Sequence, residues 1–127
     1  DGGDVCLIGV GKMFGTCLEA AALLADEGIE ATVWDPRVVK PLDEAMLDDA
    51  ARFDLVVTVE DGLREGGIGS AIAAAVERRT EGSGRSPRVA VQGVPVAYIP
   101  HGKPDAILAD LALDPAGIAA TTRTLLA

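Results

Sequence analysis

Short runs of apolar residues alternate with longer, helix-patterned stretches along the whole of this chain. The short runs are rich in Val, Ile and Leu and are bounded by Gly, Pro or Asp, so they predict strands. We expect strands at 4–10, 29–34, 54–60 and 88–91. Helices are expected at 16–28, 43–51, 68–79, 105–111 and from 115 onward. Because the strands are apolar on both faces and alternate with helices, the pattern predicts an α/β fold, with a parallel sheet inside a three-layer αβα domain.

Two helix starts carry recognisable capping patterns. Thr16 and Glu19 have the spacing of a capping box, in which the hydroxyl and the carboxylate each satisfy a free backbone N–H group. In the last helix, Asp114 is the expected N-cap ahead of a proline, and Leu113 is placed to pack on Ile118 as a hydrophobic staple. We therefore expect the first helix to begin at Thr16 and the last one just after Asp114.

Chain length and loop composition indicate one domain. The 127 residues, 49% of them hydrophobic, are enough for a core that needs no disulfide or metal. The Gly/Ser-rich segment 80–87 is an expected loop within the domain, because no second core follows it. Since the chain starts at Asp1 and enters a strand pattern almost at once, we expect residues 1–127 to be a single domain cut from a longer polypeptide.

Charge and cysteine usage exclude several classes of partner. A net charge of −9 and only 3% aromatic residues argue against binding to nucleic acid or to an anionic membrane surface. No stretch is apolar and long enough to predict a membrane span. Cys6 lies in an apolar run and Cys17 in a helical one, without metal-binding spacing. Both are expected to be core residues of a cytoplasmic protein.

The segment 55–71 is the first candidate for chemistry. Its strand-like run ends in the acidic pair Glu60 and Asp61, and a loop with Gly66 and Gly67 leads into the next helix. Ligands of α/β sheets bind at the carboxyl ends of strands, so this segment has the features of a binding site. Adjacent residues of an extended strand point to opposite sides, so the two carboxylates cannot form a facing catalytic pair. We expect one to be solvated and the other to accept hydrogen bonds from backbone N–H groups of the 66–69 turn or the helix start.

Two further segments carry groups that can bind an anion. Gly9, Gly11 and Gly15 follow the first strand with the spacing G-x-G-x-x-x-G, one residue longer than the dinucleotide fingerprint. We favour a tight turn that lets helix and sheet approach closely, with nucleotide binding as the alternative. Arg37 and Lys40 lie on a proline-bounded loop, where they can hold a phosphate or a carboxylate or form local ion pairs.

The only histidine, His101, lies beside Lys103 in a loop near the expected end of the sheet. A general base needs an orienting acid and a nucleophile, and no Ser/His/Asp order is recognisable in this chain. A single histidine also cannot build a metal site. From the residues alone we therefore assign no catalytic, cofactor-binding or metal-binding residue.

Three segments together resemble a known family. They are VWDPRVVKPLD at 33–43, VTVEDGLREGGIGSAI at 57–72 and GVPVAYIPHGKPDAILADLALDPAGIA at 93–119. The chain resembles, over essentially its whole length, the C-terminal domain of the 1-deoxy-D-xylulose-5-phosphate synthases, which are thiamine-diphosphate enzymes of the transketolase superfamily. Any one segment alone also fits the equivalent domain of a transketolase or of a pyruvate-type dehydrogenase beta subunit.

The resemblance implies a parent enzyme that joins pyruvate and glyceraldehyde 3-phosphate into 1-deoxy-D-xylulose 5-phosphate, with release of carbon dioxide. It implies thiamine diphosphate and magnesium bound by N-terminal domains, a homodimer, and a C-terminal domain that supports assembly and is inactive alone. It also implies a five-stranded mixed sheet, with a short antiparallel strand near 97–99.

The resemblance further implies that the loops at the strand ends pack against the rest of the enzyme. The candidates for interdomain or interface contacts are Arg37, Lys40, Glu60, Asp61, Gly66, Gly67, His101 and Lys103. The alternative hypothesis is an autonomous nucleotide- or anion-binding module that uses the 11–15 loop and Arg37.

Overall fold

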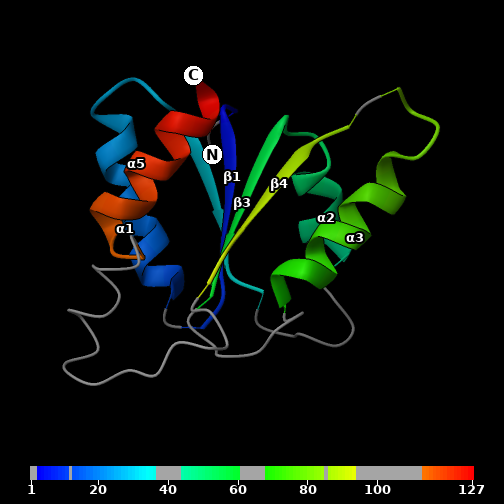
Figure 1. Ribbon diagram of the computed structural model, residues 1–127, viewed down its shortest axis with the longest axis horizontal. Coiled ribbons are helices and arrows are strands. Elements are labelled where there is room, and N and C mark those ends of the chain that lie inside the picture. Colours follow the sequence, from blue (N-terminus) through cyan, green and yellow to red (C-terminus); the bar gives the residue numbers. More distant parts are fainter. Residues whose placement is uncertain (1–2, 12, 37–43, 61–67, 85, 94–112) are drawn as a thin grey trace.

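A computed structural model describes residues 3–11, 13–36, 44–60, 68–84, 86–93 and 113–127 (Figure 1). The strands are β1 (Val5–Gly9), β2 (Ala31–Trp34), β3 (Leu55–Val59) and β4 (Arg88–Gln92). The helices in these ranges are α1 (Met13–Ala25), α2 (Glu44–Ala50), α3 (Ile68–Thr80) and α5 (Pro115–Leu126). The expected alternation of strands and helices is therefore confirmed in the described residues.

The four strands form one parallel sheet in the order β2-β1-β3-β4. Helices α1 and α5 cover one face of the sheet, and α2 and α3 cover the other (Figure 1). This arrangement confirms the parallel, three-layer αβα prediction. The fifth strand expected near 97–99 and the short helix expected at 105–111 lie outside the described residues, so the five-strand count stays a prediction.

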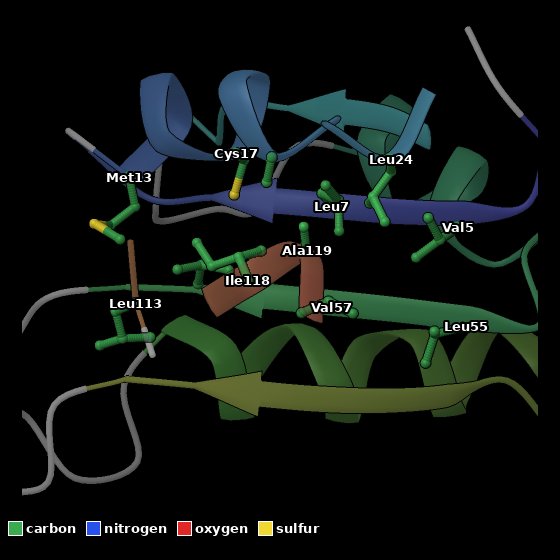
Figure 2. Close-up of a cluster of buried hydrophobic side chains, with 12 residues drawn as sticks. Val5, Leu7, Met13, Cys17, Leu24, Leu55, Val57, Leu113, Ile118 and Ala119 are labelled. Atoms are coloured by element: carbon green, nitrogen blue, oxygen red, sulfur yellow. The ribbon is translucent and has the colours of Figure 1, made fainter. Parts of the chain in front are cut away.

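The two faces of the sheet bury separate apolar clusters, because successive side chains of a strand point to opposite sides. From β1, Val5 and Leu7 join the cluster under α1 and α5, whereas Cys6 and Ile8 join the cluster under α2 and α3. Figure 2 shows the first cluster, where side chains of α5 lie between those of α1 and β3. Every residue of β1 and β3 is buried, as the apolar runs predicted.

The first helix begins earlier than its capping box indicated. Gly11 has a φ of +62°, a conformation that glycine adopts without steric cost, and it turns the chain sharply after β1. The N–H of Met13 then donates to the Val10 carbonyl over 3.1 Å, and the helix starts there. The expected start at Thr16 is wrong: that residue lies inside α1, so its hydroxyl has no helix start to cap.

The start of the last helix agrees with its sequence pattern. Asp114 has extended backbone geometry, and its carboxylate Oδ1 accepts a hydrogen bond of 2.8 Å from the Gly117 N–H. Leu113 and Ile118 are both buried in the cluster of Figure 2. The N-cap prediction is therefore confirmed, and the two apolar residues lie where the expected staple places them.

Two glycines allow helices to touch the sheet near its carboxyl edge. A Cβ on Gly9 would lie 2.5 Å from the Met13 carbonyl oxygen at the start of α1. On the opposite face, a Cβ on Gly69 in α3 would lie 2.5 Å from Val91 Cγ1 and 2.7 Å from Thr58 Oγ1. Real Cβ contacts are not this short, so only glycine fits either position while the helix stays so close to the sheet.

A side-chain hydrogen bond links β2 to α2. The Trp34 Nε1–H donates to Asp49 Oδ2 over 2.7 Å, and Asp49 also forms an ion pair with Arg52. Burial by itself raises the pKa of Asp49, but the hydrogen bonds from Trp34 and Arg52 outweigh it and hold the pKa below its ordinary value. The ionised carboxylate therefore stabilises the folded state.

We expect Gly9→Ala to lower the free energy of unfolding by about 1–3 kcal/mol, because α1 must move away from the sheet to admit the methyl group. Gly15→Ala is the matched control. Gly15 also lies at the start of α1, but a Cβ added there would have no atom within 4 Å, so alanine should raise stability by about 0.5–1 kcal/mol. Urea unfolding followed by circular dichroism measures both; equal effects of the two changes would contradict the close approach at Gly9.

Trp34→Phe keeps an aromatic ring but removes the donor to Asp49, and should lower the free energy of unfolding at neutral pH by about 1–2 kcal/mol. Because the folded pKa of Asp49 is depressed, its contribution is present above the ordinary value of 3.8 and is lost as the pH falls through the folded pKa. The wild type should therefore lose more stability than the variant over this acid range. Arg52→Gln is the control: the Arg52 side chain is 70% exposed, and its loss should cost about 0.5 kcal/mol or less.

Candidate functional site

The carboxyl ends of the four parallel strands meet at one edge of the sheet, where α/β domains bind ligands. The residues that follow the strands there are Val10 after β1, Asp35 after β2, Glu60 after β3 and Gly93 after β4. Val10 donates its N–H to the Val59 carbonyl over 2.9 Å, which extends the β1–β3 pairing by one residue. This edge is the candidate site that the sequence indicated.

Glu60 is the one candidate interface residue within the described ranges. Its backbone N–H donates to the Gln92 carbonyl over 3.0 Å, which fixes it beside the end of β4. A Cβ on Gly93 would lie 3.4 Å from Glu60 Cγ and 3.8 Å from Oε1, so the half-buried side chain leans across Gly93. The structure thus places this carboxylate at the carboxyl edge, and acceptance of N–H bonds from the 66–69 turn stays a prediction.

The other candidates fall where the structure gives no description. Arg37, Lys40, Asp61, Gly66, Gly67, His101 and Lys103 lie outside the described residues. That they lie near Glu60 stays a prediction from the sequence, in which each belongs to a segment that follows β2, β3 or β4 along the chain.

The glycines after β1 have structural roles. Gly9 lets α1 touch the sheet and Gly11 makes the turn, whereas Gly15 has an exposed position on α1 with open space around it. The N–H groups of Met13 and Phe14 donate to the Val10 and Gly11 carbonyls over 3.1 Å each. Because these N–H groups already have partners, the start of α1 is not a ready phosphate cradle. The tight-turn interpretation is confirmed.

The thiols of Cys6 and Cys17 are unreactive. Cys6 and Cys17 are buried in opposite faces of the sheet, as their apolar surroundings predicted. Burial raises the pKa of each thiol to about 12, so both stay protonated and are poor nucleophiles and poor metal ligands. Within the described ranges, no group of three or more His, Cys, Asp or Glu residues is positioned to hold a metal ion.

A second feature was not found from the sequence. A hollow of about 730 Å³ lies between β2 and α2, lined by Gly3, Thr32, Val33, Trp34, Ala45, Asp49 and Arg52. Asp49 and Arg52 have i, i+3 spacing on one helix, but Trp34 is 15 residues from its partner Asp49. Only the packing of α2 on the sheet brings them together, so no local pattern indicated this site.

None of the helices in the described ranges is long and apolar enough to cross a membrane.

Known proteins resemble this chain over nearly its full length. The family profile "Transketolase, C-terminal domain" matches residues 1–118. A 1-deoxy-D-xylulose-5-phosphate synthase of Thermobifida fusca is 43% identical over 116 residues, which cover 91% of this chain and 18% of the relative. A synthase of the same name from Magnetococcus marinus is 36% identical over 125 residues, covering 98% of this chain and 20% of the relative. The chain thus spans about a fifth of the length of these curated relatives.

Solved structures show the same fold. A split-gene transketolase described as an inactive beta4 tetramer superposes with a TM-score of 0.83 at 32% identity, covering 99% of this chain and 40% of the other. A Pichia stipitis transketolase in complex with sedoheptulose 7-phosphate superposes with a TM-score of 0.64 at 16% identity, covering 99% and 17%, and shows the fold alone. With a family profile that matches 118 residues and a fold that agrees, the chain belongs to the transketolase C-terminal domain family.

Proposed function

We propose that this chain is the C-terminal domain of a 1-deoxy-D-xylulose-5-phosphate synthase and serves in the assembly of the parent enzyme. The observation that supports the proposal most directly is its identity of 36–45% to curated synthases of that name, over 91–98% of the chain. Similarity that extends over a whole domain at this level relates the chain more closely to these synthases than fold alone does.

In this proposal the parent enzyme is a cytoplasmic homodimer that converts pyruvate and glyceraldehyde 3-phosphate into 1-deoxy-D-xylulose 5-phosphate and carbon dioxide. The product supplies the synthesis of isoprenoids, thiamine and pyridoxal. Thiamine diphosphate and magnesium supply the decarboxylation chemistry when bound to the other domains. At the start of α1, the N–H groups of Met13 and Phe14 already donate to carbonyls, so these two groups are not free to bind the cofactor's diphosphate.

The domain itself is proposed to be non-catalytic. Its two thiols are held protonated by burial, so neither supplies a thiolate nucleophile. The candidates at the carboxyl edge, Arg37, Lys40 and Glu60 among them, are then proposed to contact neighbouring domains. A transketolase parent is the second candidate, supported by the split-gene transketolase with 32% identity and a TM-score of 0.83.

The parent polypeptide, supplied with thiamine diphosphate and magnesium, should release carbon dioxide from pyruvate in a reaction that depends on glyceraldehyde 3-phosphate. Deletion of the C-terminal domain, which corresponds to residues 1–127 of this chain, should abolish this activity. It should also shift the enzyme from dimer to monomer in light scattering. Two-carbon transfer from a ketose phosphate without carbon dioxide release would instead support the transketolase candidate. Unchanged activity and oligomeric state after the deletion would contradict the assembly role.

Glu60→Gln tests the candidate site separately, because it keeps the shape of the side chain and removes its charge. If the carboxylate accepts backbone N–H bonds, the free energy of unfolding should fall by about 1–2 kcal/mol. Glu19→Gln on the exposed side of α1 is the control and should change stability by about 0.5 kcal/mol or less. Chemical unfolding of both variants gives the comparison, and equal small effects would place Glu60 in solvent.

A further inference from the structure

We draw no further inference here: the strongest candidate, the apolar outer face of helix α1, where the Leu18 and Leu23 side chains are exposed, carries no proposal because nothing in the structure shows what covers it.

Discussion

Burial of the two central strands on both faces is the constraint on which the rest of this domain depends. All residues of β1 and β3 are buried, so helices must cover both sides of the sheet. The result is two separate apolar clusters, one under α1 and α5 and the other under α2 and α3. Parallel strand direction follows from the helical crossovers, which return the chain to the same end of the sheet after each strand.

In the described part of the chain, this burial holds the interior thiols in an unreactive form. The Cys6 and Cys17 thiols stay protonated, with pKa values raised to about 12, and the hydroxyl of Thr58 is enclosed beneath Gly69. Other polar and charged side chains lie instead at the edges of the sheet. Glu60 lies at the carboxyl edge, and the pair of Trp34 and Asp49 links β2, an outer strand of the described sheet, to α2.

The outcome for particular residues shows how far sequence patterns reach. The Asp114 cap was predictable because its partner, the Gly117 N–H, is three residues away. The start of α1 was not predictable in the same way. The sequence offers a capping box at Thr16, but the chain turns earlier, at Gly11 with its positive φ, and the helix begins at Met13. The acidic pair was recognised in the sequence, but the approach of Glu60 to Gly93 joins the residues that follow two different strands.

The sequence by itself determined the alternation of strands and helices, the apolar character of the core strands and the family to which the chain belongs. These properties depend on residues close together in the chain or on motifs read directly from it. The tertiary structure decided the strand order, which glycines touch a neighbouring element, and the pairing of Trp34 on β2 with Asp49 on α2. Such contacts join residues far apart in the chain, so they exist only once the helices have packed on the sheet.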